Sequence, residues 1–180
     1  FQSSLFTIAR RRILWLLILV LANGLTTKVI AMNDQILKDI VLLAAFIPLL
    51  IGTGGNVGAQ SSTVVIRGLS TQKLKSLGAV KAVVRESITG ALLGVLMMLV
   101  VFPFAWWQGE GPLIASAVGI SLISITTLAA TTGAILPLLF DKMRLDPALM
   151  SSPFITTVTD IAGVFIYLST AKWLLASKFL

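Results

Sequence analysis

The chain has 180 residues, of which 57% are hydrophobic and 12% charged, and its mean hydropathy is +0.99. Soluble domains carry about 25% charged residues, so the composition excludes a soluble domain and indicates a helical membrane bundle. The absence of Cys and His excludes disulfides and thiolate metal sites and removes the commonest general base. No nucleophile is paired with a base, so we do not expect an enzyme.

The formal net charge of +7 would suit a nucleic-acid partner, but the distribution of the basic residues does not. They flank apolar runs and do not line one face or groove, so we expect a lipid bilayer as the partner and no nucleic acid. Residue 1 is Phe and not Met, and we therefore expect the chain to be an excerpt of a longer protein.

Five charge-poor stretches are long enough to cross a membrane, since a spanning helix needs about 20 predominantly apolar residues. The expected spans lie near 13–32, 40–66, 87–109, 111–140 and 148–176. The third ends in Trp106-Trp107, which suits an interfacial aromatic belt. The sequence therefore predicts an all-α membrane protein with five transmembrane helices in a single domain over residues 1–180.

The basic residues predict the orientation of these spans. With a cytoplasmic N-terminus, ten of the 14 Lys and Arg residues fall on the inside, namely Arg10, Arg11, Arg12, Arg67, Lys73, Lys75, Lys81, Arg85, Lys142 and Arg144. An excess of Lys and Arg marks cytoplasmic loops. We therefore expect a cytoplasmic N-terminus and an extracytoplasmic C-terminus.

The second span contains an unusual run of small and polar residues, Pro48-Leu-Leu-Ile-Gly-Thr-Gly-Gly-Asn-Val-Gly-Ala-Gln. Gly54 and Gly58 form a GxxxG pattern, which is typical of close helix packing. Asn56 and Gln60 are four residues apart and share a helical face with Thr53 nearby, and polar side chains at membrane depth face the bundle interior or water. Packing alone and a pore-lining helix both fit this pattern, and we favour a pore.

Asp160 is the one acid in the middle of the fifth span. An ionised carboxylate there costs about 2.5–3.5 kcal/mol on insertion scales, and every Lys or Arg lies at or near a span end. The carboxyl is therefore either protonated and bonded to hydroxyls such as Thr156, Thr157 and Thr159, or ionised and facing water and a cation. A merely structural role is less favoured, since Asn or Ser would serve it.

Oxygen atoms line one side of the fifth span, because Ser152, Thr156 and Asp160 recur at intervals of four. Oxygen ligands without nitrogen or sulfur suit a hard cation such as Mg²⁺. Asp146 opens the same helix before Pro147. That pair is an ordinary helix start, and a second cation site at the cytoplasmic mouth is the alternative.

These segments resemble a known family. The run from Pro48 to Ser61, followed by Arg67, resembles the second transmembrane helix of the MgtE family of magnesium channels. Four segments of this chain resemble the fifth helix of that family, namely Asp146-Pro-Ala-Leu, Ser152-Pro153, Thr159-Asp160-Ile-Ala-Gly163 and Ile166-Tyr167-Leu-Ser. The order and spacing of the segments cover essentially the whole chain.

The resemblance implies a homodimer in a prokaryotic cell membrane, with the pore on the two-fold axis between the second and fifth helices of both subunits. It implies that Asp160 recognises hydrated Mg²⁺, with the Thr156 carbonyl one turn earlier, Asp146 at the inner mouth and Asn56 on the glycine-rich helix. Many relatives have Asn where this chain has Ser152. The family also carries N-terminal cytoplasmic domains, including a CBS pair, which these 180 residues lack.

The sequence thus predicts a Mg²⁺-selective channel domain that passes hydrated divalent cations, with Asp160 as the selectivity residue. The expected pore lining is Thr53, Gly55, Asn56, Gln60 and Ser152. A secondary carrier that couples H⁺ or Na⁺ to the metal remains the alternative, since a broken, Gly-rich helix fits it too. A non-transporting assembly subunit is a third class, and it predicts that Asp160→Asn keeps function.

Overall fold

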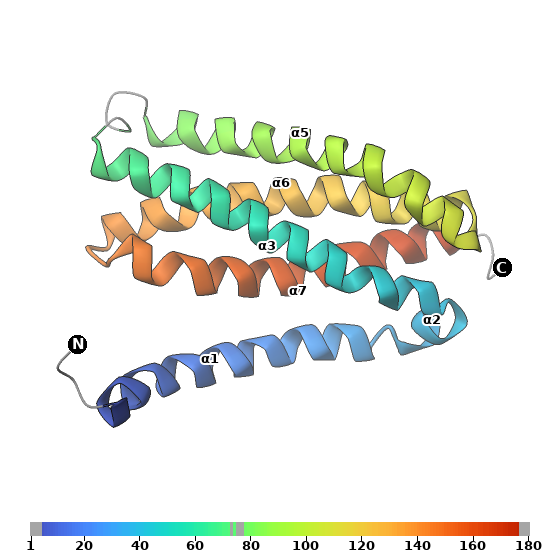
Figure 1. Cartoon of the computed structure of the whole chain (residues 1–180), viewed down its shortest axis with the longest axis horizontal. Helices are drawn as coiled ribbons and strands as arrows, with labels where there is room; N and C mark the ends of the chain where they lie inside the picture. The colour runs from blue at the N-terminus through green and yellow to red at the C-terminus, as the bar shows by residue number, and fades with distance from the viewer. Residues whose placement is uncertain (1–4, 73, 75–77, 177–180) are drawn as a thin grey trace.

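A computed structural model of the chain describes residues 5–72, 74 and 78–176, some of them by their backbone alone. Every regular element in this part of the chain is helical, which confirms the predicted all-α class. In chain order the elements are α1 (Leu5–Ala31), α2 (Asp34–Asp39), α3 (Val41–Ser70), α5 (Ala79–Ala105), the π-helical turn η1 (Trp106–Glu110), α6 (Pro112–Lys142) and α7 (Pro147–Leu175). Figure 1 shows the long helices running side by side as an elongated bundle.

Helix α6 forms the centre of the bundle and packs against α3, α5 and α7. Helix α1 lies at the edge along α7 (Figure 1), and exposed Leu and Ile side chains surround it. Among the described residues, four helices, α3, α5, α6 and α7, are long and apolar enough to cross a membrane. The apolar part of α1, Leu16–Ala31, is shorter than these spans. A first span near 13–32 therefore stays a prediction.

The helices are longer than the charge-free stretches that the sequence analysis used to place the spans. Helix α5 begins at Ala79 and not near Ser87, so Lys81, Arg85 and Glu86 lie on its first turns. Charged side chains mark where a helix leaves the lipid, whereas the helix itself continues until the backbone geometry changes. Gly78 (φ 84°) and Gly111 (φ 85°) reverse the chain before α5 and α6, because glycine adopts positive φ without steric cost.

The helix α2 was not predicted, whereas the π-helical turn η1 lies mostly within the span predicted near 87–109. The short helix α2 carries Asp34 and Lys38, which form the one ion pair found among the described residues. The turn η1 continues α5 through Trp106 and Trp107, both exposed. Trp173 on α7 is also exposed, and α5 and α7 both finish at the same end of the bundle (Figure 1). These three indoles therefore suit one membrane interface, as predicted for the Trp pair.

Glycines allow the central helices to approach until their backbones touch. A β-carbon added at Gly133 of α6 would collide with the backbone carbonyl of Gly58 on α3. On the other side of α6, one added at Gly90 of α5 would lie 2.6 Å from the carbonyl oxygen of Thr126. Small residues at helix interfaces drive packing in lipid, where no hydrophobic effect acts between helices. The Gly54 and Gly58 pair does serve packing, as one reading of the sequence expected.

A buried hydrogen bond links α3 to α7 near the end of the bundle that carries α2. The hydroxyl of Tyr167 donates to the carbonyl oxygen of Leu43 at 3.1 Å, and both residues are fully buried. Hydrogen bonds between membrane helices contribute about 1 kcal/mol.

We expect Tyr167→Phe to lower the free energy of unfolding by about 1 kcal/mol, because it removes this bond and leaves the ring in place. Thermal unfolding in detergent measures the change. Ser169→Ala, an exposed change on the same helix, is the control. Equal midpoints for wild type and Tyr167→Phe would show that the helical donor alone satisfies the Leu43 carbonyl.

Candidate pore-lining site on helices α3 and α7

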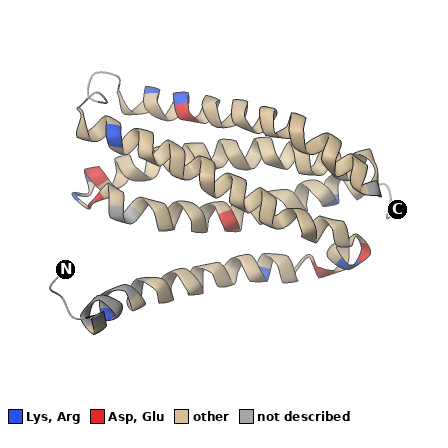
Figure 2. Ribbon diagram, in the orientation of Figure 1, with Lys and Arg blue, Asp and Glu red and all other residues tan. Residues whose placement is uncertain are grey.

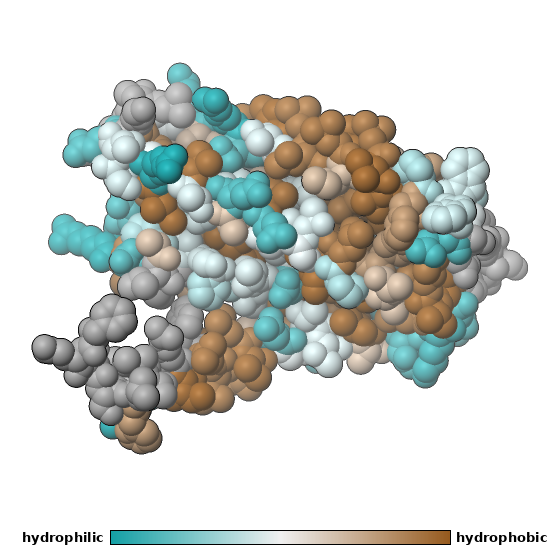
Figure 3. All heavy atoms as spheres, in the orientation of Figure 1, coloured by the Kyte–Doolittle hydropathy of each residue, from teal (hydrophilic) through white to brown (hydrophobic). Residues whose placement is uncertain are grey.

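Two exposed helix faces of the bundle differ sharply in their side chains. The exposed face of α5 consists of large apolar residues, including Val84, Ile88, Leu92 and Leu96. Between Val41 and Val64, the exposed positions of α3 are instead small or polar, namely Ala44, Ala45, Pro48, Gly52, Asn56, Gln60 and Thr63. Figure 3 shows hydrophilic side chains reaching the middle of this view of the molecule, whereas the α5 edge is hydrophobic. The α5 face suits lipid, and the α3 face suits water or another protein surface.

Asp160 lies near the middle of α7 and is half-buried. Figure 2 shows charged residues gathered toward the two ends of the bundle, with an acidic position midway along α7. Within the described residues its carboxylate has no ion-pair or hydrogen-bond partner. The neighbouring hydroxyls bond elsewhere: Thr159 donates to the Ile155 carbonyl at 2.7 Å, and Thr156 donates to the Pro153 carbonyl at 3.0 Å. A hydroxyl that donates to a carbonyl can still accept from a protonated carboxyl, so the choice between the two states expected from the sequence stays a prediction.

The structure brings the polar line of α7 beside the glycine-rich part of α3. Ser152 and Thr156 are exposed, on the side of α7 that also carries Asp160. A β-carbon added at Gly55 would lie 3.9 Å from Cγ2 of Thr156, which is ordinary van der Waals contact. The candidate residues of the two helices are therefore neighbours in space, although about 100 residues separate them in the sequence.

The α3 residues of the candidate lining fall into two groups. Asn56 and Gln60 are exposed, whereas Thr53 and Gly55 are half-buried between the exposed face and the bundle. The sequence analysis missed one feature of this face, although Pro48 signals it. Proline has no N–H, so the carbonyl of Ala44 lacks its usual helical donor. Ala44 is exposed on α3, and a carbonyl without its usual donor there also favours water over lipid.

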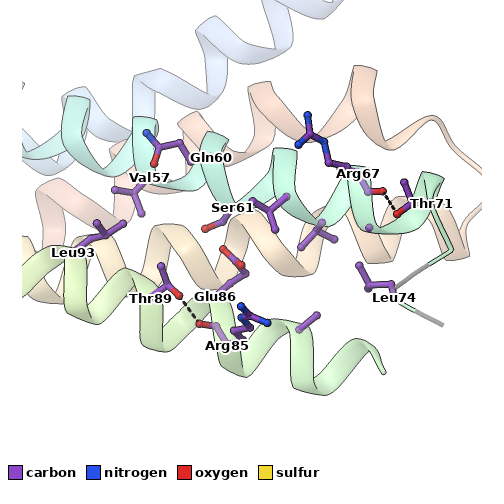
Figure 4. Close-up of a pocket in the computed structure, with 14 residues that line it drawn as sticks. Val57, Gln60, Ser61, Arg67, Thr71, Leu74, Arg85, Glu86, Thr89 and Leu93 are labelled. Atoms are coloured by element: carbon purple, nitrogen blue, oxygen red, sulfur yellow. Dashed lines mark hydrogen bonds between the residues drawn. The ribbon is translucent and has the colours of Figure 1, made fainter. Parts of the chain in front are cut away.

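A groove of roughly 600 Å³ separates α3 from α5 at the opposite side of α3 from α7. Figure 4 shows Glu86 and Ser61 directed into the space between the two helices, while the guanidinium of Arg67 points away from α5. Gln60 lies at the edge of this groove. The groove gathers no second acid beside Glu86 and is not lined by Asp160, and Gln60 is the one candidate pore-lining residue that borders it.

Asp146 is the N-cap of α7, since its side chain accepts a hydrogen bond from the backbone N–H of Ala148 at 2.8 Å. The expected helix start is therefore present. At about 1.5 Å per residue, Asp146 lies roughly 20 Å along α7 from Asp160, so the structure does not bring these two carboxylates into one ion site.

We expect Asp146→Ala to lower the free energy of unfolding by about 1 kcal/mol, and Asp146→Ser to leave it nearly unchanged, because Ser also caps a helix but carries no charge. Thermal unfolding of the two variants measures the cap. The Mg²⁺ concentration dependence of transport by Asp146→Ser then isolates the charge. An unchanged dependence would mean that Asp146 serves as a cap alone.

Among the described residues, no three acids lie close enough to hold a metal ion together. One chain therefore offers a single carboxylate at midspan, on a helix face that also carries the side-chain hydroxyls of Ser152 and Thr156. Such a set cannot replace the six ligands of Mg²⁺, but it can accept hydrogen bonds from the water that Mg²⁺ retains. A site completed by a second copy would double the number of carboxylates.

The apolar helices and the polar line within them define a multi-pass protein of the cell membrane. The family described as divalent cation transporter, MgtE, matches residues 47–170. The chain is 38% identical over 164 residues to the magnesium transporter MgtE of Thermus thermophilus, with 91% of this chain and 36% of that protein covered. It is 34% identical over 172 residues to the magnesium transporter MgtE of Bacillus subtilis, with 95% of this chain and 38% of that protein covered.

The chain therefore belongs to the MgtE family, which confirms the resemblance drawn from its second and fifth spans. It spans a little over a third of the length of the curated relatives that it matches.

Proposed function

We propose that this chain is the transmembrane pore domain of a divalent cation transporter and that it conducts hydrated Mg²⁺. The observation that carries the proposal is Asp160, a half-buried acid at midspan with no partner among the described residues. A carboxylate in that position requires water or a cation. The relatives in Thermus thermophilus and Bacillus subtilis are named magnesium transporters, which supports Mg²⁺ as the transported ion.

The pore in this proposal lies on the two-fold axis of a homodimer, between α3 and α7 of both copies. The small and polar face of α3 supports this arrangement, since it is unsuited to lipid. Two Asp160 carboxylates would then face each other, as rings of acidic side chains do in cation channels. Asn56, Gln60, Thr53, Gly55 and Ser152 line the water-filled path, and cytoplasmic regulatory domains are the partners expected for this pore.

Asp160 acts in this proposal by accepting hydrogen bonds from water bound to the ion. Mg²⁺ gives up its water reluctantly, so the carboxylates and the Thr156 carbonyls hold the hydrated ion without stripping it. Selection then depends on the size of the hydrated octahedron, and binding stays weak enough for release. Asp146 contributes a second, weaker contact at the inner mouth.

Single-channel recording of the purified chain in a planar bilayer, with Mg²⁺ as the charge carrier, tests this function. A pore gives unitary currents that need no gradient of another ion. A coupled carrier gives none, and its Mg²⁺ flux into liposomes depends on an H⁺ or Na⁺ gradient. A chain that transports no divalent cation in either assay would contradict both mechanisms and leave an assembly subunit.

A further inference from the structure

Thr159, the residue before Asp160, faces the bundle and not the candidate pore. Its side chain is 1% exposed, and its hydroxyl donates to the carbonyl of Ile155 at 2.7 Å. That bond sets the rotamer, because a helical Thr chooses between two χ1 values according to the carbonyl its hydroxyl reaches. The rotamer in turn directs the methyl group, Cγ2, toward α3.

The methyl group of Thr159 lies where a side chain of α3 would otherwise be. A β-carbon added at Gly54 would lie 2.5 Å from Cγ2 of Thr159 and 2.6 Å from Cγ2 of Ile125 on α6. Helices α3, α6 and α7 therefore meet at this glycine. At Gly52, two residues earlier, an added β-carbon meets nothing within 4 Å.

Because α7 is a rigid helix, a fixed residue fixes the direction of its neighbours. Successive side chains differ by about 100° around the axis, so the rotation that seats Thr159 against Gly54 also determines where Asp160 points. The Asp160 carboxylate has no partner of its own among the described residues to hold it. The orientation of the acid therefore depends on the packing of the residue beside it.

We propose that Thr159, with its methyl group seated against Gly54, is a positioning residue that orients the Asp160 carboxylate and so sets selectivity for the hydrated divalent ion. This inference rests on the proposed function. It adds two residues that do not face the pore, and it assigns them a role in selection in addition to their contribution to packing.

The test compares two glycine-to-alanine substitutions, one on α3 and one on α1, by the Mg²⁺-over-Na⁺ permeability ratio, with thermal stability measured in parallel. Gly54→Ala forces α7 or α3 to move, and we expect the ratio to fall by about 10- to 100-fold, as for groups that orient metal ligands. Gly24→Ala lies on α1, outside the proposed pore, and its added β-carbon meets nothing within 4 Å, so its ratio should stay within about twofold of wild type. Equal ratios for the two variants would overturn the inference.

A second set of variants separates orientation from folding. Thr159→Ser keeps the hydroxyl bond and loses only the methyl, so it should lower the ratio while unfolding near the wild-type temperature. The triple change Gly54→Ala, Thr159→Ser, Ile125→Leu removes both colliding methyl groups and should recover the ratio relative to Gly54→Ala alone. If Gly54→Ala does not fold, an unchanged ratio in Thr159→Ser overturns the inference by itself.

Asp160→Asn distinguishes this inference from the function on which it rests. If Asp160→Asn retains wild-type selectivity, the selectivity role that the proposed function gives to Asp160 fails. If Asp160→Asn loses selectivity while Thr159→Ser and Gly54→Ala retain it, the function stands and the positioning role fails.

Discussion

Asp160→Asn should reduce Mg²⁺ transport and selectivity by at least about tenfold, since each hydrogen bond from ion-bound water to a charged acceptor contributes about 1.5–3 kcal/mol. Asn has nearly the same volume as Asp, so the packing around Asp160 should be unchanged. In a homodimer the substitution removes two negative charges at once. Single-channel recording and liposome flux of Mg²⁺ measure the loss.

Asp39→Asn is the matched control for this experiment, because Asp39 is an exposed acid at the end of α2. It makes the same chemical change outside the proposed pore and should leave Mg²⁺ transport near the wild-type level. Normal, selective currents in Asp160→Asn would contradict the proposed role of the acid. They would favour a structural role for it.

Gly133→Ala should lower the free energy of unfolding by about 1–3 kcal/mol, the usual cost of overpacking. The added methyl collides with the backbone carbonyl of Gly58, and backbone cannot rotate away as a side chain can. Helix α3 must therefore shift against α6. Because α3 carries Asn56 and Gln60, transport should fall together with stability.

Gly119→Ala is the matched control on the same helix. The three atoms nearest to an added β-carbon there all belong to the side chain of Met98, with Cγ at 2.8 Å, and a flexible Met can move aside. Thermal unfolding in detergent should therefore place Gly119→Ala near wild type and Gly133→Ala well below it. Equal midpoints would show that α3 and α6 separate at little cost.

The resemblance of particular segments to a family was sufficient to identify the chain, and hydropathy alone was sufficient for its class. Asp160 stands out in the sequence because a charge inside an apolar run is costly in lipid wherever the helix lies. The interval of four from Ser152 to Thr156 and Asp160 also predicts a shared face without tertiary information, since helical periodicity is local.

The helix ends were less predictable than the spans. Charge marks the limit of the lipid-covered segment, but α5 begins before Arg85 because a helix continues until a residue such as Gly78 reverses the chain. The helix α2 was missed because its six residues are too few for a periodic pattern.

The sequence by itself determined that this protein is a helical membrane bundle with an acid at midspan, because composition and periodicity are properties of the chain, and the resemblance of its motifs pointed to the MgtE family. Only the tertiary structure decided which glycines touch which helix. Gly52, Gly54 and Gly55 are nearly adjacent, yet one meets open space, one the methyl of Thr159 and one the methyl of Thr156 at van der Waals distance. That difference depends on how α3 is rotated against α6 and α7, which is set by the packing of all three helices together.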